Sequence, residues 1–171
     1  MKIWNDTDIP LACLISFRTY GTWLPGDDRG SIDRFHNEYL GDRVTANTAL
    51  SKQHQSKLKC PRVTIDAAQR GYVGIAITKV CRFRKWDLLA LNVRTNHAHV
   101  VAAIGTALVE KALNDFKAYA TRGLRENDCW PHEHSPWVNK GSLRRLWNED
   151  SVARACDYVI NGQGDVLPDF L

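Results

Sequence analysis

Two histidines, two positions apart in an apolar stretch, are the residues of this chain best spaced to do chemistry. His97 and His99 stand in Asn96-His97-Ala98-His99-Val100-Val101. Such a run predicts a β-strand, in which residues two apart point to the same face. The two imidazoles would then face one spot, as two nitrogen ligands of a metal ion do. The spacing suits equally well two half-buried histidines that each hydrogen-bond to a neighbour.

Tyr158 is the second residue that could do chemistry, and it lies in the predicted last helix. It falls outside the apolar stripe of that helix and shares a helical face with Arg154 and Asn161. A tyrosine in this place can be a surface residue whose hydroxyl stays in water. It can also be a nucleophile, although a phenol with a pKa near ~10 needs a cation or base nearby to attack phosphorus. The stripe itself consists of Val152, Ala155, Cys156, Val159 and, at its edge, Ile160.

Two further candidates are less well placed. Tyr119 continues the apolar stripe of an earlier predicted helix, which favours packing over catalysis. A second His-x-His pair, His132 and His134, lies between Trp130-Pro131 and Ser135-Pro136. Prolines on both sides indicate a solvent-exposed turn, where two imidazoles are not held toward one point.

Periodicity and turn residues indicate the elements that position these side chains. The predicted order is strand, helix, strand, strand, helix, strand, followed by one more helix. The first six elements have the split β-α-β order of ferredoxin-like sandwiches. We therefore predict an α+β fold: an antiparallel sheet with helices on one face and an additional C-terminal helix that carries Tyr158. The expected strands are Leu11 to Thr19, Asp87 to Thr95, His97 to Ile104 and Trp137 to Leu146.

The expected helices have definite ends and inward faces. The first is capped by Thr64 and runs to about Phe83, the second is capped by Thr106 and runs to about Arg125, and the last runs from Glu149 to near Gly162. The inward residues of the first are expected to be Ile65, Ala68, Tyr72, Ile75 and Lys79, and those of the second Leu108, Ala112, Phe116 and Tyr119 or Ala120.

The composition predicts one domain over residues 1–171. The chain has 171 residues and is 44% hydrophobic, enough for a single core. A polar insertion is expected at about residues 20–61, with a loop from Tyr20 to Gly30 and a short helix from Thr48 to Lys57. No apolar run approaches the ~18 residues of a membrane span, so a cytoplasmic protein is expected. The five cysteines lack CxxC spacing and are expected to be reduced thiols.

The charge is mildly basic and permits a polyanionic partner. The formal net charge is +4, and two basic clusters stand out. The second cluster has the adjacent Trp147 and is the one that would suit a single-stranded nucleic acid. Cations can track such a backbone, and a ring can stack on an unpaired base for about 1–3 kcal/mol. The first cluster is Lys79, Arg82, Arg84 and Lys85, and the second is Lys140, Arg144 and Arg145.

From about Leu11 to Leu167 the sequence resembles the single-tyrosine HUH transposases, the insertion-sequence-200-like enzymes. It is most similar to their relatives, the REP-associated tyrosine transposases. The family's His-hydrophobic-His motif corresponds to His97-Ala98-His99, its long helix to Leu113–Leu124, and its tyrosine-bearing segment to Arg144–Val159. The family usually has Met-Pro-Asn or Pro-Asp before the histidines, whereas this chain has Arg94-Thr95-Asn96, of which the asparagine alone fits.

The resemblance implies metal-dependent cleavage of single-stranded DNA beside a folded hairpin, and strand transfer. Tyr158 would be the nucleophile that becomes linked to the 5′ phosphate. His97 and His99 would hold Mg²⁺ or Mn²⁺. The family takes a third polar ligand from about one turn beyond the tyrosine, where this chain has Gly162. Asn161 and Gln163 flank that glycine, and both stay candidates.

A second class of function is compatible with the same residues. A catalytically inactive protein of this fold would bind single-stranded or hairpin DNA through its basic clusters without forming a covalent adduct. A monomer and a homodimer are both compatible with the sequence. An unrelated metal-dependent hydrolase is less favoured, because no cluster of carboxylates accompanies the histidines.

Overall fold

The computed structural model describes residues 8–24 and 46–167. The chain forms two compact units, one made of residues 1–18 and 64–171 and the other of residues 19–63. The second unit has nearly the boundaries expected for the polar insertion. Residues 25–45, which include most of the expected loop from Tyr20 to Gly30, lie outside the described residues.

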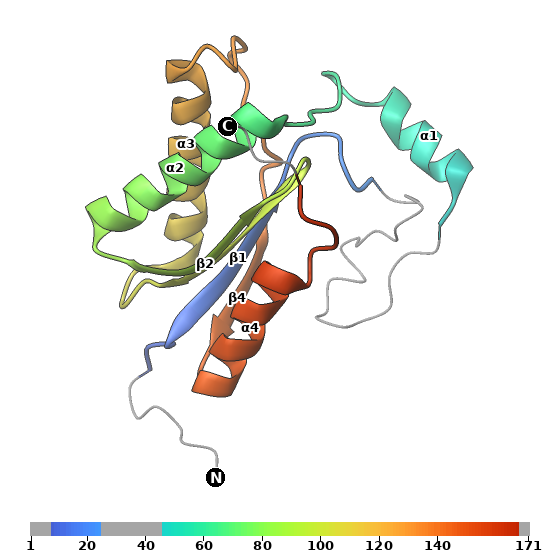
Figure 1. Cartoon of the computed structure of the whole chain (residues 1–171). Coiled ribbons are helices and arrows are strands. Elements are labelled where there is room, and N and C mark those ends of the chain that lie inside the picture. Colours follow the sequence, from blue (N-terminus) through green and yellow to red (C-terminus); the bar gives the residue numbers. More distant parts are fainter. Residues whose placement is uncertain (1–7, 25–45, 168–171) are drawn as a thin grey trace. The chain divides into compact units, whose positions relative to one another are not determined.

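The first unit is built on a four-stranded antiparallel sheet with the order β2-β3-β1-β4. This is the ferredoxin-like arrangement, and the predicted fold class is confirmed. Figure 1 shows α2 and α3 on one face of the sheet and α4 on the other. The strands are β1 (Ala12–Arg18), β2 (Asp87–Val93), β3 (His97–Ala103) and β4 (Ser142–Leu146), and the helices are α2 (Ala67–Arg84), α3 (Val109–Glu126) and α4 (Glu149–Asn161).

Alternation along the strands divides the core between the two faces of the sheet. On β1, Leu14 belongs to the apolar cluster under α4, so Ile15 and Phe17 point toward α2 and α3. Phe17 meets the edge of Trp137 with ring centroids 4.9 Å apart. The cluster under α4 consists of Ala12, Leu14, Ala90, Val101, Leu146, Ala155 and Val159, with Val152 and Cys156 packed against it.

The predicted N-caps of α2 and α3, Thr64 and Thr106, are both wrong. α2 is capped by Asp66, whose carboxylate accepts from the Gln69 backbone N–H while the Gln69 side chain accepts from the Asp66 N–H. This reciprocal capping box satisfies two N–H groups at the start of α2. Thr106 lies in a turn after Gly105, which has a φ of +58°, and α3 begins at Val109 without a side-chain cap.

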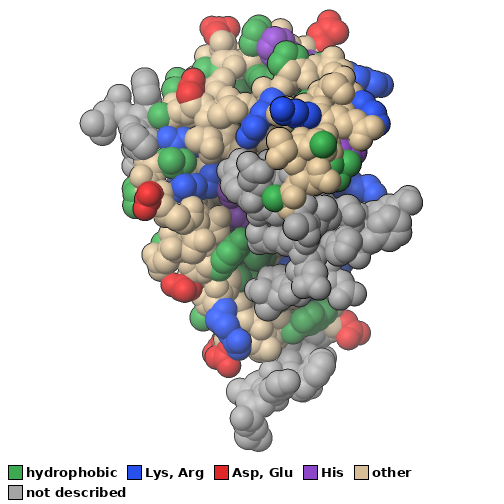
Figure 2. Space-filling model, turned by 90° about the vertical axis from the view of Figure 1, so that its right-hand side faces the viewer, with side chains coloured by type: hydrophobic (Ala, Val, Ile, Leu, Met, Phe, Trp, Pro, Cys, Tyr) green, Lys and Arg blue, Asp and Glu red, His purple; other side chains and the backbone are tan. Residues whose placement is uncertain are grey.

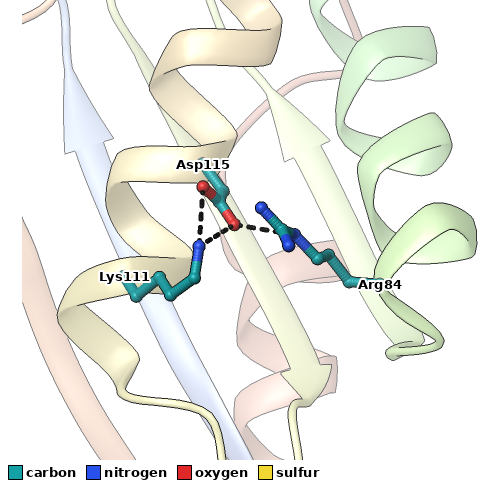
Figure 3. Close-up of polar contacts among 3 residues, drawn as sticks. All are labelled: Arg84, Lys111 and Asp115. Atoms are coloured by element: carbon teal, nitrogen blue, oxygen red, sulfur yellow. Dashed lines mark hydrogen bonds and ion pairs between the residues drawn. The ribbon is translucent and has the colours of Figure 1, made fainter.

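The inward faces predicted for α2 and α3 are also partly wrong. Ile75 is 54% exposed and Leu108 is 69% exposed. α2 carries apolar residues on several sides, so its sequence allows more than one phase. An acidic residue of α3, Asp115, pairs with Arg84 at 3.0 Å and with Lys111 at 3.0 Å, which ties the end of α2 to α3 (Figure 3). The buried residues of α2 are Val73, Ala76, Ile77, Val80 and Cys81.

β4 is shorter than the predicted strand from Trp137 to Leu146. The buried ammonium of Lys117 donates to the carbonyls of Val138, Asn139 and Lys140 at 2.8, 2.9 and 3.1 Å. Three successive carbonyls that point to one cation cannot alternate as in a sheet ladder. Residues 138–141 therefore form a loop, and the strand begins at Ser142.

The second unit contains the predicted short helix, α1 (Thr48–Ser56). Asn47 caps this helix by accepting from the Leu50 N–H at 3.0 Å. The Tyr20 carbonyl accepts from the Val63 N–H at 2.9 Å, and the Tyr20 hydroxyl accepts from the Lys59 N–H at 3.1 Å. These bonds join the two ends of the unit.

The part of the chain that the structure describes contains no helix both long and apolar enough to cross a membrane. All five cysteines are free thiols.

Candidate active site

The two histidines lie at the start of β3 and face α4. Their ring centroids are 4.6 Å apart, and both side chains are buried. His99 stands opposite Ser16 on β1 and Asn92 on β2, and His97 stands opposite Arg18. The strand therefore holds both imidazoles on one side of the sheet, as their spacing predicts.

The hydrogen bonds of the rings leave one nitrogen of His99 without a partner. The Nδ1–H of His97 donates to the Asn96 side-chain oxygen at 2.7 Å, and Nδ1 of His99 pairs with the Ser16 hydroxyl. Nε2 of His99 is buried and has no hydrogen-bond partner. A buried polar atom without a partner is costly, about 1–3 kcal/mol, and is a frequent sign of a ligand site.

Tyr158 lies next to this pair. Its ring centroid is 5.5 Å from that of His99, and 46% of the residue is exposed. Of the apolar stripe predicted for α4, Val152, Ala155, Cys156 and Val159 pack on the sheet, whereas Ile160 at its edge is 59% exposed. This packing turns Tyr158 to the rim of the histidine site. Tyr119 lies on α3, beyond the other face of the sheet, with the Arg122 guanidinium 5.1 Å from its ring centre. It cannot reach the histidines.

Gln163, rather than Asn161, reaches the histidines. Its amide N–H donates to the Tyr158 carbonyl at 3.0 Å, and this bond turns Oε1 toward His97 Nε2, 3.3 Å away. In the tautomer that has the His97 proton on Nδ1, the lone pair of Nε2 faces Oε1 of Gln163. Asn161 donates instead to the Asp157 carboxylate at 2.8 Å, one turn back on the exposed side of α4.

The site favours neutral imidazole. Burial, with a smaller contribution from the neighbouring His97, lowers the pKa of His99 from 6.5 to about 3, and Gln163 partly opposes this shift. No hydrogen bond of ordinary geometry joins Gln163 to Nε2 of His99. His99 therefore keeps its lone pair at every ordinary pH, which is the form that binds a metal.

The donor set fits one divalent cation. Among residues 8–24 and 46–167, no group of three or more His, Cys, Asp or Glu side chains could hold a metal. The available donors are Nε2 of His97, Nε2 of His99 and Oε1 of Gln163. In that tautomer of His97, a bound cation would satisfy both the unpartnered nitrogen of His99 and the facing lone pairs of His97 and Gln163. Mg²⁺ and Mn²⁺ prefer oxygen, so phosphate or water must complete the coordination.

The second basic cluster is divided between the faces of the sheet. Arg144 is opposite Leu14 and lies on the α4 face, whereas Arg145 is opposite Cys13 and lies 3.7 Å from Glu110 of α3. Lys140 is exposed in the loop before β4, and Trp147 is 40% exposed after it. Figure 2 shows basic side chains in separate groups rather than in one continuous patch.

Sequence reasoning missed three residues of this site. Ser16 pairs with His99, Asn92 donates to the Val159 carbonyl at 2.9 Å, and Arg94 donates to the Asp165 carbonyl at 2.8 Å. A signal was present for Asn92, which is the one polar residue from Leu88 to Val93. Ser16 and Arg94 gave no signal that distinguishes them from other surface or strand residues.

Comparisons with known proteins give two similar solved structures. The chain is 13% identical to a REP-associated tyrosine transposase bound to a REP hairpin, with a TM-score of 0.49 over 93% of this chain and 70% of the other. It is 12% identical to a proposed transposase from Deinococcus radiodurans R1, with a TM-score of 0.47 over 94% of this chain and 97% of the other. The first of these structures is a REP-associated tyrosine transposase, the group whose motifs the sequence resembles. No family model and no curated protein matches the chain.

Proposed function

We propose that this protein cleaves and rejoins single-stranded DNA through a covalent link between Tyr158 and a 5′ phosphate, with Mg²⁺ or Mn²⁺ as cofactor. The observation that carries the proposal is the meeting of three rings at one end of the sheet. His97, His99 and Tyr158 come from two elements far apart in sequence, and their centroids are 4.6 and 5.5 Å apart in succession.

The proposed reaction is one substitution at phosphorus, run in either direction. The Tyr158 oxygen loses its proton to solvent and bonds to phosphorus, and the bond from phosphorus to the 3′ oxygen breaks. The 3′ oxygen takes up a proton and leaves as a hydroxyl. A second 3′ hydroxyl can attack the phosphotyrosine and release Tyr158, so joining needs no external energy.

The chain's own residues position the reactants. His97, His99 and Gln163 would hold the cation, which would draw charge from the phosphate oxygens and offset the charge of the transition state. The half-exposed ring of Tyr158 can reach a phosphate that approaches from solvent. Arg144, on the same face of the sheet, is the basic residue that we assign to the DNA backbone.

The test is incubation with end-labelled single strands that carry a hairpin, in the presence of Mn²⁺. We expect a shifted protein–DNA band that survives denaturation. Tyr158→Phe should fold, bind the strand and give no such band. Tyr119→Phe, the matched control on the other face of the sheet, should give the band as the unchanged protein does.

Two results would contradict the proposal. Loss of the band in Tyr119→Phe and its persistence in Tyr158→Phe would mean that the wrong tyrosine has been assigned. Salt-sensitive DNA binding without any adduct from the unchanged protein would leave the protein as a DNA-binding member of this fold.

A further inference from the structure

β2 anchors the end of α4 that carries the site. The last four carbonyls of a helix have no partner within the helix and must find one elsewhere. In α4 the Val159 carbonyl accepts from the Asn92 side chain at 2.9 Å. Beyond the helix, the Asp165 carbonyl accepts from Arg94 at 2.8 Å. These two bonds lie on either side of Gln163.

A β-bulge in β2 determines which residues face α4. Leu88 pairs with Ala102, but Ala90 rather than Leu89 pairs with Val101. The extra residue reverses the alternation beyond it, so Asn92 stands opposite His99.

The reversed alternation also explains the place of Leu91. Without the bulge Leu91 would stand opposite His99 and face α4. With the bulge, Leu91 pairs with Val100 and faces α2. Its side chain packs toward Gly74 of α2: a Cβ added to that glycine would lie 3.9 Å from Leu91 Cδ2. Ala90, Asn92 and Arg94 then form one row along α4: Ala90 packs in the apolar cluster, and the other two donate to the backbone.

We propose that Asn92 is a positioning residue that fixes Tyr158 and Gln163 relative to the two histidines. The inference rests on the proposed function. Asn92 acts on the carbonyl of Val159, the residue directly after Tyr158. Gln163 in turn donates to the Tyr158 carbonyl. A helix end released at Val159 would carry both side chains away from His97 and His99, and a misplacement of about 1 Å can slow a reaction about 100-fold.

The test compares Asn92→Ala with a matched control, Asn127→Ala. Asn127 donates to the Gly123 carbonyl at 2.8 Å near the end of α3, so each variant removes one asparagine bond to a helix carbonyl. Three quantities are measured: hydrogen exchange of the last-turn amides of α4 without DNA, the rate of adduct formation at saturating DNA, and the dissociation constant of the DNA. Asn92→Ser, which stays polar but is too short to reach Val159, is the second variant.

We expect Asn92→Ala and Asn92→Ser to speed exchange in the last turn of α4 and to slow adduct formation about tenfold or more. The DNA dissociation constant should change less than about twofold, since no phosphate contact is removed. Asn127→Ala should leave all three quantities unchanged. Unchanged exchange in both Asn92 variants, or a slower rate explained by weaker DNA binding, would overturn the inference. Should the unchanged protein form no adduct, the proposed function fails, and the exchange measurement still decides the role of Asn92.

Discussion

The face of the sheet under α2 and α3 is filled mostly by apolar side chains, and its buried cation, Lys117, is bonded to three carbonyls. The face under α4 is apolar at one end and carries two buried histidines at the other. Phe17, Val100 and Phe116 are fully buried in the first core. The apolar cluster under α4 does not extend to the start of β3, where His97 and His99 are buried instead. An apolar pair there would avoid the cost of burying imidazole without a partner.

The difference between the faces shows where buried polar side chains replace the apolar side chains that would pack better. Departures from good packing and hydrogen bonding tend to gather at functional sites. On the α2 and α3 face the charged groups are paired, as Asp115 is with Arg84 and Lys111. A buried nitrogen without a hydrogen-bond partner occurs on each face, at Nε1 of Trp137 beside Phe17 and at Nε2 of His99 on the α4 face. The nitrogen of His99 differs because its ring lies beside a second imidazole and a tyrosine, with ring centroids 4.6 and 5.5 Å away.

Removal of divalent ions should abolish cleavage and leave most of the DNA binding. The cation is assigned to the phosphate, whereas the arginines and lysines supply the salt-dependent affinity. The measurement is adduct formation and binding in excess EDTA, with recovery after Mn²⁺ is restored as the control. His99→Ala should match the chelated protein. Full cleavage in EDTA would mean that the histidines have another task.

Phe116→Ala should lower the free energy of unfolding by about 3–5 kcal/mol, because it empties part of the apolar core under α3. Leu108→Ala, at a residue that is 69% exposed on the same side of the molecule, should stay within about 0.5 kcal/mol. Urea unfolding measures both. Equal losses in the two variants would contradict the assignment of the packed face.

Acid should lower the free energy of unfolding, because the buried His99 resists protonation in the folded protein. Its pKa is about 3 in the folded protein and 6.5 when exposed, so below pH 6.5 the unfolded chain binds a proton that the folded protein does not. Stability from this group is therefore complete above pH 6.5 and falls as the pH drops toward 3. Between pH 8 and pH 5 the free energy of unfolding should fall by about 2 kcal/mol.

The control for the acid effect is His99→Gln, which does not titrate in this range. In metal-free buffer its unfolding free energy should fall less between pH 8 and pH 5 than that of the unchanged protein. Parallel curves for the two proteins would show that His99 is not buried in its neutral form.

Asp115→Asn should cost about 0.5–1 kcal/mol, because its partners Arg84 and Lys111 are partly exposed and screened by water. The loss should shrink in 1 M salt. Cleavage should be unchanged, since the pairs lie on the face away from the histidines. A loss of cleavage without a loss of stability would contradict this expectation, because it would mean that Asp115 affects the histidine site from the opposite face.

The sequence predicted the elements of the fold from patterns within each segment. The apolar stripe of α4 follows from helical spacing, and β1 and β3 follow from their apolar and β-branched runs. The caps, the phase of α2 and the start of β4 were missed because each depends on a partner elsewhere. Lys117, a charged residue within an apolar stripe, gave no sign that it would bind three carbonyls of the loop before β4.

The candidate site was predictable for residues within one element and not for residues brought in by others. The shared face of His97 and His99 follows from their spacing. The choice between Asn161 and Gln163 depends on the path of the chain after α4, which spacing does not determine. Asn92 was missed because a bulge at Leu89 reverses the alternation of β2, and one extra residue in a strand leaves no mark in an apolar sequence.

The most direct test of the account is to identify the residue that carries DNA after reaction. The unchanged protein is incubated with a hairpin-bearing single strand and Mn²⁺, digested with nuclease and protease, and analysed by mass spectrometry for a nucleotide-linked peptide. We predict a 5′-phosphate link to Tyr158, in the peptide that also contains Val159. A link to Tyr119, or cleaved DNA with no linked peptide, would contradict the account.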